Sequence, residues 1–369
     1  MYNASTSIRA WWMSTRFGPG RERRCGVEAL KAGVFGVGDV AIEYIKSINA
    51  NLGSEVVAVV GRDKNKTKAR VAAHGFTCEV LDAYDDLVRR SDIDMIVITS
   101  PHFMHADETI RAAQAGKHVI CEKPIGMDSA EVGRVYRAVK AAGVKFQCGM
   151  VLRWNPFVIN LKHMIETGVF GRLFYIEIDY FHKLSPVWNG FSWGGQKRSG
   201  GPSASLVAGI HAVDLVRYLC GEVESVHAEC VRGHREDFEY PPTYLSAVKF
   251  ANGAVGKTSC SFEIESPYLV NVLLHGSKGS VVQNRFYFKE SFPGQTGWQT
   301  FETVMPDSGA VSHHPFQFLV DDFVGSIRDN REPELNIEES FLTHELCMAI
   351  DQSMESGETV RLPFISRQE

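Results

Sequence analysis

Three absences narrow what this 369-residue chain can be. No run of lysine and arginine stands out and the formal net charge is -5, so the chain offers no basic field for a nucleic-acid backbone. No apolar stretch approaches the roughly 20 residues that span a bilayer. The eight cysteines lie far apart, in no CxxC pair and no Cys/His spacing typical of zinc ligands. We therefore expect no nucleic-acid partner, no membrane partner and no bound metal.

The cysteines and the N-terminal residues also indicate where in the cell the protein is located. Widely spaced cysteines without a disulfide framework are typical of reduced, mostly buried thiols in a cytoplasm. The first two dozen residues carry Trp11, Trp12 and several arginines, but no apolar core of signal-peptide length. We expect residues 1–28 to be a flexible extension and the protein to be cytoplasmic.

The chain is too long to fold around a single hydrophobic core of ordinary size, so its length predicts two domains. From Ala32 onward, short apolar runs alternate with amphipathic segments of helical length, which is typical of a parallel sheet with crossover helices. We predict a Rossmann dinucleotide-binding domain over residues 29–149, with strands at 32–36, 56–60, 95–98, 118–121 and 146–149. Longer strands with period-two alternation follow. They predict an α/β domain over residues 150–369 with a large, predominantly antiparallel open sheet and a closing helix over 337–355.

A glycine-rich turn lies between the first predicted strand and the first helix. Its sequence is Gly36-Val37-Gly38-Asp39-Val40-Ala41, which fits the G-x-G-x-x-G/A pattern. Glycines there permit a tight turn and close approach of a pyrophosphate, and the helix N-terminus favours its negative charge. Alone, the pattern also fits an ordinary strand-to-helix turn. Its place at the start of a β-α-β series favours a dinucleotide held by Gly36, Gly38, Asp39 and Val40.

The end of the second strand separates NAD from NADP in such folds. Here Gly61 stands where an acidic residue usually accepts from the ribose hydroxyl, and Arg62 follows it. A guanidinium at that place can pair with a 2'-phosphate, so NADP(H) is favoured over NAD(H). In the alternative reading, Arg62 stacks on the adenine and Asp63 reaches the ribose, which suits NAD(H).

A lysine follows the predicted strand at 118–121, at the edge of the sheet where ligands of open α/β sheets bind. It belongs to Glu122-Lys123-Pro124. Together with the glycine turn and three further motifs, this segment resembles the Gfo/Idh/MocA family of oxidoreductases from about Lys31 to Pro363. The further motifs are Thr99-Ser100-Pro101, Arg153-Trp154-Asn155-Pro156 and Gly209-Ile210-His211-Ala212-Val213-Asp214.

The resemblance implies roles for individual residues. Lys123 matches the lysine that hydrogen-bonds the reacting oxygen, and His211 matches the general acid/base, for which a histidine titrates in the right range. Without the family, His211 reads as a structural hydrogen bonder and Lys123 as half of a surface ion pair. The resemblance also implies that the cofactor is contacted by Lys123 and by residues of the same loops: Ser100, Pro101, His102, His105 and Glu122. The spacing of His102 and His105 could suggest a metal, but no further ligand completes such a site.

One position departs from the family. Dehydrogenases of the family usually carry an aspartate four residues before the histidine, whereas this chain has Val207. An imidazole without that carboxylate loses an expected partner for its cation. Ser205 or Asp214 could compensate in part.

Further residues are expected to border the substrate. In similar proteins this border includes the segments that carry Arg153, Trp188, Trp193 and Arg198, and aromatic faces suit the C–H surfaces of sugars. Tyr180 and His182 share one face of a predicted strand and could point at the same ligand or form a subunit contact. We count Val207 with this group because of its place near His211.

These residues indicate hydride transfer between NAD(P) and a CH–OH or C=O carbon of a sugar, polyol or cyclitol. Two alternatives stay open: glycoside cleavage through transient oxidation, and a silent dinucleotide-binding regulator suggested by Val207. The Tyr-Pro-Thr-His pattern of the family's best-known glycosidases is missing from the sequence. The resemblance also implies a homo-oligomer, a dimer or tetramer, formed through the sheet of the second domain.

Overall fold

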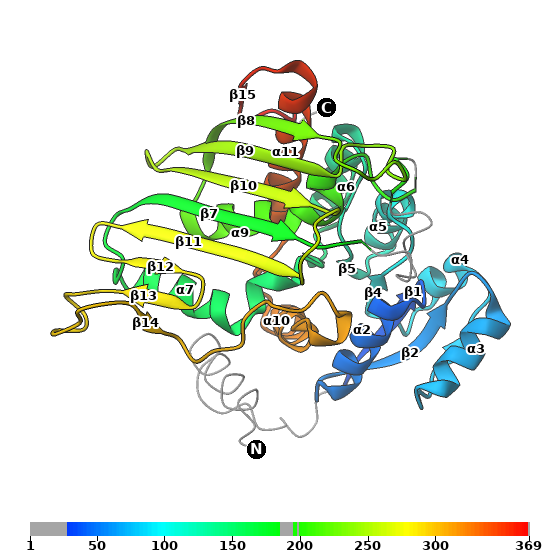
Figure 1. The fold of residues 1–369 in the computed structure, drawn as a ribbon. Coiled ribbons are helices and arrows are strands. Elements are labelled where there is room, and N and C mark those ends of the chain that lie inside the picture. Colours follow the sequence, from blue (N-terminus) through cyan, green and yellow to red (C-terminus); the bar gives the residue numbers. More distant parts are fainter. Residues whose placement is uncertain (1–27, 185–194, 198, 368–369) are drawn as a thin grey trace.

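The short apolar runs of the first half form one parallel sheet in a computed structural model that describes residues 28–184, 195–197 and 199–367 (Figure 1). Neighbouring strands in this sheet all run parallel. In spatial order they are β3 (Glu79–Val80), β2 (Ser54–Val60), β1 (Leu30–Phe35), β4 (Met95–Ile98), β5 (His118–Cys121) and β6 (Phe146–Cys148). The predicted Rossmann-type fold is confirmed. Strand order reverses between β1 and β4, which is where ligands of such sheets bind.

Helices cover both faces of this sheet. They are α2 (Asp39–Ala50), α3 (Lys64–Ala73), α4 (Tyr84–Arg89), α5 (His105–Gln114) and α6 (Ser129–Ala142), with a 3-10 turn η1 (His102–Met104) before α5. Local chemistry sets their ends. The Asp128 side chain accepts from the Glu131 amide at the start of α6, and Gly143 ends that helix in the left-handed conformation.

The second sheet has nine strands in the described chain. In spatial order they are β14 (Gln299–Thr300), β13 (Arg285–Tyr287), β12 (Ser280–Val282), β11 (Leu269–Gly276), β7 (Leu173–Phe181), β10 (Val255–Ser261), β9 (Thr243–Phe250), β8 (Val223–Val231) and β15 (Val360–Arg361). Only the β7 and β10 pair is parallel, so the predicted, predominantly antiparallel sheet is confirmed.

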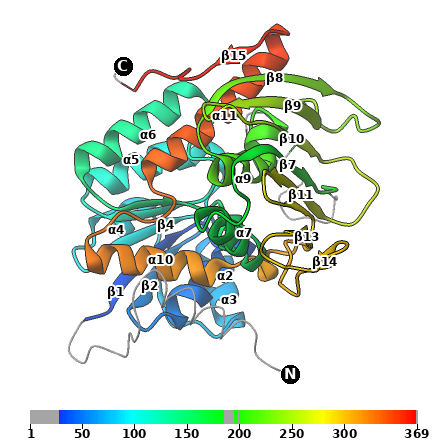
Figure 2. The same cartoon turned by 90° about the vertical axis from the view of Figure 1, so that its left-hand side faces the viewer.

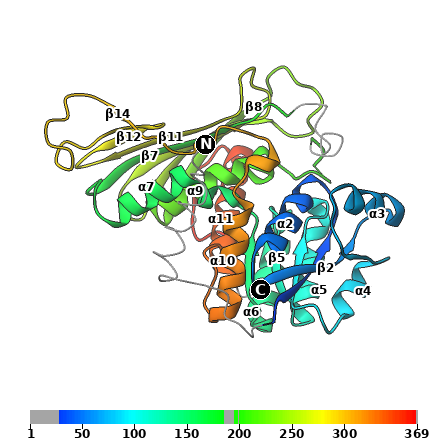
Figure 3. The same ribbon diagram turned by 90° about the horizontal axis from the view of Figure 1, so that it is seen from below.

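One face of this sheet carries the helices. Figure 3 shows α7 (Pro156–Glu166), α9 (Ile210–Cys220) and α11 (Ile337–Ser356) beneath it, while no helix of the described chain covers the opposite face. Alternation in β9 explains the arrangement, because its residues are buried and exposed in turn. The inward set packs on the helices and the outward set is left bare.

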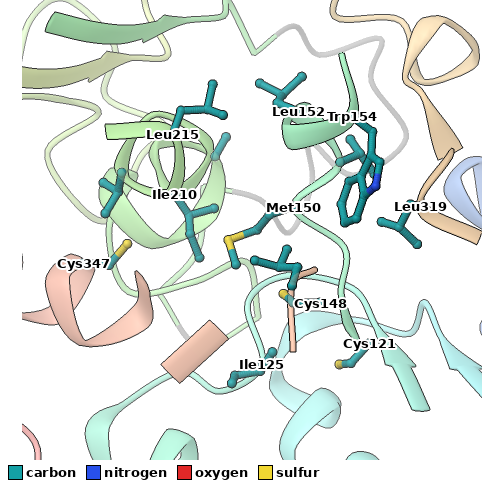
Figure 4. Close-up of a cluster of buried hydrophobic side chains, with 14 of the residues drawn as sticks. Cys121, Ile125, Cys148, Met150, Leu152, Trp154, Ile210, Leu215, Leu319 and Cys347 are labelled. Atoms are coloured by element: carbon teal, nitrogen blue, oxygen red, sulfur yellow. The ribbon is translucent and has the colours of Figure 1, made fainter. Parts of the chain in front are cut away.

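The two domains share one apolar core. Figure 4 shows buried side chains from β5, β6, α9, α11 and α10 (Phe316–Asp329) meeting around Met150. Two helices from the end of the chain pack back on the first domain, α10 on α2 and α11 on α6 (Figure 2). The site at the edge of the first sheet is therefore built between surfaces that are rigidly joined.

A buried ion pair ties the turn η2 (Val151–Trp154) to the helices. The Arg153 guanidinium, 2% exposed, donates to both carboxylate oxygens of Asp214 at 2.8 and 2.6 Å and to Glu339 at 3.0 Å. Buried charges of this kind are tolerated when they are paired and hydrogen-bonded. Arg153 thus connects η2 to α9 and α11.

The remaining predictions about composition have partial outcomes. The described cysteines form no disulfide. None of the helices in the described ranges has the length and apolar content of a membrane span. No cluster of three or more His, Cys, Asp or Glu side chains suited to a metal occurs in the part of the chain that the structure describes. The predicted extension at 1–28 lies almost wholly outside the described residues.

Candidate functional site

The glycine turn has the geometry that a dinucleotide requires. Gly36 has φ +87°, and a Cβ there would lie 2.5 Å from the Thr99 carbonyl oxygen, so only glycine fits. Gly38 caps α2 without a side-chain hydrogen bond, and a Cβ on it would meet nothing within 4 Å. The first amides of α2 are therefore open to an anion, which fits the pyrophosphate of NAD(P). The carboxylate of Asp39, which would repel that anion, forms an ion pair with Arg70 of α3.

The end of β2 has no room for an acidic side chain at position 61. A Cβ on Gly61 would collide with the Thr67 hydroxyl. Asp63 is the N-cap of α3 and accepts from the amides of Asn65 and Lys66 at 2.9 Å each. These backbone hydrogen bonds lower the pKa of Asp63 and keep it ionised. Arg62 is exposed beside them.

Hydrogen bonds to neighbouring loops fix the loop that follows β4. The Thr99 hydroxyl donates to the Gly36 carbonyl at 2.6 Å, which ties this loop to the glycine turn. His105, which is fully buried, has Nε2 2.8 Å from the Ser100 carbonyl and Nδ1 2.7 Å from the Pro124 carbonyl. Both ring nitrogens of His105 thus lie at hydrogen-bond distance from backbone carbonyl oxygens. We expected His105 to contact the cofactor, and the structure places it as a brace between the two loops that carry Ser100 and Lys123.

The other members of this loop lie nearer the surface of the site. Pro101 is exposed and precedes η1. The His102 ring is buried, with Nδ1 at hydrogen-bond distance from the Gly200 carbonyl of the second domain. His102 therefore links the cofactor loop to the segment before α9.

A buried acid lies behind Ser100. The Glu108 carboxyl is 4% exposed, its Oε2 accepts from the Ser100 hydroxyl, and its Oε1 has no partner among the described residues. Burial raises the pKa of Glu108 from 4.5 to about 8. Ser100 is therefore held by a carboxyl group that is protonated at neutral pH.

Glu122 and Lys123 follow β5 at the carboxyl edge of the sheet. The Glu122 carboxylate accepts from the Tyr44 hydroxyl of α2 at 2.9 Å and from the Lys123 amide at 3.2 Å. Gly149 leaves the space that this carboxylate fills, since a Cβ there would collide with it. Glu122 is thus turned toward α2 and supports the lysine backbone.

The Lys123 ammonium reaches across to the second domain. Its Nζ donates to the Val207 carbonyl at 2.7 Å. Val207 lies in a π-turn, η3 (Ser205–Gly209), which runs directly into α9, and π-turns shift backbone carbonyls out of the regular α-helical ladder. Burial lowers the pKa of Lys123, while Glu122 opposes that shift.

His211 stands one turn after that contact. Its ring stacks on Tyr180 of β7 with centroids 5.5 Å apart, and its Nδ1 is buried without a hydrogen-bond partner in the described chain. Burial lowers the pKa of His211 well below its ordinary value, and Lys123 adds to the shift. The imidazole is therefore neutral near pH 7, the state in which it can accept a proton.

Two neighbours extend this cluster along β7. Burial lowers the pKa of His182 to about 4, with Lys123 contributing. The His182 ring meets Tyr268 edge-on at 5.3 Å, and Tyr268 meets Tyr180 at the same distance. Tyr180 and His182, predicted from their shared strand face, thus lie beside His211 and Lys123.

Sequence reasoning missed His314 and Tyr268. His314 lies in the loop before α10, and its pKa is lowered by burial and then by Lys123, while His314 in turn lowers the pKa values of His182 and His211. Gly309 of the same loop lies against His182, because a Cβ there would be 2.9 Å from Nε2. The pair His313-His314 before a helix was the only signal in the sequence, and no periodicity connects it to β7.

Other predicted residues lie elsewhere. The guanidinium of Arg153 is directed into the ion pair with Asp214, so it does not present free donors to a substrate. Ser205 donates to Asp351 at 2.6 Å and Asp214 binds Arg153, so neither replaces the missing carboxylate beside His211. The side chain of Val207 is 2% exposed and packs where Gly201 leaves room for it.

Three predicted substrate residues lie outside the described residues. They are Trp188, Trp193 and Arg198.

The assembled groups suit proton and hydride chemistry. A lysine with a lowered pKa and a neutral histidine lie together at the edge of a sheet whose glycine turn fits a dinucleotide. When it is bound, the nicotinamide would accept or donate the hydride.

Comparisons with known proteins agree with this geometry. Residues 30–150 match a model described as an oxidoreductase family with an NAD-binding Rossmann fold, and residues 162–362 match the C-terminal alpha/beta domain of the same family. Levoglucosan dehydrogenase of Pseudarthrobacter phenanthrenivorans is 30% identical over 217 residues, which cover 52% of this chain and 56% of that protein. The match thus spans little more than half of that relative's length.

Two further similarities extend over more of the chain. Inositol 2-dehydrogenase of Rhizobium meliloti is 27% identical over 259 residues, covering 68% of this chain and 74% of that protein. The solved structure of a levoglucosan dehydrogenase in complex with NADH and levoglucosan has a TM-score of 0.81 at 22% identity, covering 91% of this chain and 100% of that one. The structural similarity shows a shared fold.

The buried acid behind Ser100 predicts a pH-dependent stability. An unfolded chain ionises Glu108 near 4.5, whereas the native carboxyl ionises near 8, so the native state loses stability as the pH rises through this window. The neutral variant Glu108→Gln avoids this loss. We expect the difference in unfolding free energy between Glu108→Gln and wild type to grow by roughly 3 to 4 kcal/mol between pH 5 and pH 8. Urea denaturation at several pH values measures it.

The neighbouring exposed acid supplies the control. Asp107→Asn changes the same charge on the same helix, but the Asp107 side chain is 73% exposed and its variant should show a difference that is flat with pH. A flat difference for Glu108→Gln as well would show that Glu108 is ionised in the native protein.

Proposed function

Because the chain belongs to the Gfo/Idh/MocA oxidoreductase family, we propose that it transfers a hydride between NAD(P) and a CH–OH or C=O carbon of a sugar, polyol or cyclitol. The observation that carries the proposal is the meeting of Lys123 and His211. The hydrogen bond from Lys123 to Val207 brings these two side chains from different domains to the edge of the sheet that carries the glycine turn.

The protein residues have distinct tasks in this reaction. The Lys123 Nζ hydrogen-bonds the reacting oxygen and stabilises the charge that develops there. In the oxidative direction the neutral imidazole of His211 accepts the hydroxyl proton, and in the reductive direction the imidazolium returns it. Tyr180 keeps the His211 ring in place by stacking on it.

The relatives support the substrate class. The curated relatives described above act on levoglucosan and inositol according to their names, and both compounds carry several secondary hydroxyl groups. Nothing in these comparisons favours the alternatives of glycoside cleavage or a silent regulator.

The role of Lys123 predicts a selective loss of chemistry. Lys123→Met keeps the shape of the side chain but removes the donor, so we expect the hydride-transfer step to slow by roughly 100-fold while the Kd of the cofactor stays within about threefold. Single-turnover absorbance at 340 nm, with the best substrate from a panel of polyols and aldoses, measures the step.

A second buried lysine at the other end of the same strand is the matched control. Lys117 donates to the carbonyls of Arg90 and Ile93, on the side of the sheet away from the site, so Lys117→Met should lower stability and leave the chemical step unchanged. Near wild-type turnover in Lys123→Met would end the proposed role.

For the cofactor, we propose NADP(H) ahead of NAD(H). The exposed Arg62 stands at the end of β2, where Gly61 can carry no acidic side chain. The carboxylate of Asp63 is already the N-cap of α3, which disfavours the alternative in which it reaches the ribose.

This preference predicts an asymmetric response to removal of the guanidinium. Arg62→Ala should weaken NADPH by about tenfold and NADH by less than threefold, because only NADPH offers a 2'-phosphate. Fluorescence titrations of both cofactors measure the two Kd values, with Arg134→Ala as a control arginine far from β2. Equal losses for the two cofactors would contradict the assignment.

We also propose that the protein is a homo-oligomer, a dimer or tetramer, joined through the helix-free face of the second sheet. This face carries three exposed apolar side chains on β9, β10 and β11, Leu245, Val255 and Leu269, which are 50, 51 and 39% exposed. Between them lies an ordered polar group in which Asp179, 2% exposed, accepts from Ser259 and Asn271 and pairs with Lys257. Apolar area around a paired polar centre suits a self-complementary interface.

Sedimentation velocity tests the assembly. We expect wild type at two or four times the chain mass of 41.1 kDa and Leu245→Lys at a smaller assembly, because a charge in an apolar interface is costly. Leu52→Lys, at an exposed leucine of the first domain, should leave the assembly unchanged. A wild-type species of 41.1 kDa would contradict the proposal.

We propose a cytoplasmic location as well. The support is that the described cysteines are free and most of them are buried, as is typical of proteins kept in a reducing compartment.

A further inference from the structure

The site gathers basic groups and excludes acids. Lys123 lowers the pKa values of His182, His211 and His314, and His314 lowers those of His182 and His211. No carboxylate contributes to the shifts of these three histidines, whereas Glu122 raises the pKa of Lys123 against the effect of burial. None of these four side chains forms an ion pair with an acid in the described ranges. The sequence at 185–194 and at 198, between those ranges, also contains no Asp or Glu.

Two acids in neighbouring segments, Glu122 and Glu263, bind other groups. The Glu122 carboxylate accepts from the Tyr44 hydroxyl and the Lys123 backbone amide, toward α2. The Glu263 carboxylate accepts from the amides of Gly233 and His234 at 2.9 and 3.0 Å, in the loop after β8. Both carboxylates accept hydrogen bonds within their own loops, so neither forms an ion pair with Lys123 or the histidines, although Glu122 still raises the pKa of Lys123.

Continuous contacts show that these basic groups share one face. His211 stacks on Tyr180 at 5.5 Å, Tyr180 meets His182 at 6.2 Å, and His182 meets Tyr268 at 5.3 Å. The loop of His314 closes this row, because a Cβ on its Gly309 would lie 2.9 Å from His182 and 3.1 Å from Tyr268.

His314 is held in a defined orientation within that loop. Its Nδ1 lies 3.0 Å from the Ala310 carbonyl, which places the ring proton on Nδ1 and leaves Nε2 for other partners. Phe316, two residues on, packs edge-on against Tyr44 at 4.8 Å, and Tyr44 is the residue that holds Glu122. The loop therefore connects the helix behind Lys123 with the histidine row.

We propose that the substrate is an acidic sugar whose carboxylate lies among Lys123, His182 and His314. The proposal rests on the proposed function and names the substrate class of the same site. A half-buried ammonium whose direct partner is one backbone carbonyl is incompletely compensated, and a carboxylate beside it forms a charge-assisted hydrogen bond. A neutral sugar brings no negative charge to the Lys123 ammonium.

The size of the opposing charge favours a carboxylate over a phosphate ester. The described site offers one lysine and three histidines that are neutral near pH 7, which suits a single negative charge. A phosphate monoester carries nearly two negative charges and is usually met by several cations or by a set of backbone amides.

Matched sugar pairs test the proposal. We would compare glucose with glucuronate, galactose with galacturonate and mannose with mannuronate, as substrates with NAD(P)+ and as ligands of the NAD(P)H complex. Because a charge-assisted hydrogen bond contributes more than about 1.4 kcal/mol, we expect the acid to exceed the neutral sugar by about tenfold or more in kcat/KM for at least one pair. Equal or weaker use of the acid in all three pairs would overturn the proposal, and glucose 6-phosphate exceeding every uronate would replace the carboxylate with a phosphate.

A negative charge introduced at His314 locates the carboxylate. His314→Glu should lower the acid-to-neutral ratio by about tenfold, because a like charge then faces the ligand. His313→Glu makes the same change one residue earlier on an exposed side chain, and its ratio should stay within threefold of wild type. Equal losses in both variants would show a general field effect and contradict the assigned place. If His314→Glu does not fold, as judged from its thermal unfolding, His314→Gln takes its place with a smaller expected loss of the ratio.

The binding arm separates this inference from the proposed function. Tighter binding of a uronate than of its aldose to the NAD(P)H complex, without turnover of either, would remove the dehydrogenase assignment and keep the acid preference. Turnover of neutral sugars without any preference for acids would keep the dehydrogenase assignment and remove the acid preference.

Discussion

The hydrogen bond between the Lys123 ammonium and the Val207 carbonyl is the contact on which the site depends. Lys123 belongs to the end of a strand in the first domain, and Val207 belongs to the π-turn that starts α9 in the second. The contact therefore keeps Lys123 beside the start of α9 only while the two domains keep their relative position. The shared core around Met150 and the packing of α10 on α2 provide that rigidity (Figures 2 and 4).

Much of the surrounding structure serves these two loops without touching a ligand. His105 binds the carbonyls of Ser100 and Pro124, and Glu122 binds the hydroxyl of Tyr44. Arg153 and Asp214 join η2 to α9, so the helix that carries His211 is held about one turn after that residue. Orientation of the reacting groups is thus distributed over buried polar contacts, each of which would be costly to leave half satisfied.

The chemical character of the site follows from burial without a carboxylate. Val207 brings a backbone carbonyl to Lys123 and a packed apolar side chain to Gly201. Histidines in such surroundings stay neutral, since desolvation disfavours their charged form. A ligand that carries its own negative charge alters that balance more than a neutral one, and this difference is the basis of the proposed acidic substrate.

Sequence reasoning predicted local features well and side-chain directions poorly. Apolar runs identified β1, β2, β4, β5 and β6, because a buried strand must be apolar on both faces. It assigned Arg153 to the substrate and His105 to the cofactor, although both are engaged inside the protein. The partners that decide these orientations, Asp214 and Pro124, are set by how the chain folds back on itself, which no local pattern records.

The sequence by itself predicted the α/β fold class and the glycine turn, and through the family resemblance it singled out Lys123 and His211 as the proposed reacting pair. These depend on periodicity and on motifs a few residues long. Tertiary structure decided which groups besides Tyr180 and His182 surround that pair. His314 reaches Lys123, His182 and His211 from a loop more than a hundred residues along the chain from either of the first two, because α10 must pack on α2 to bury its apolar face.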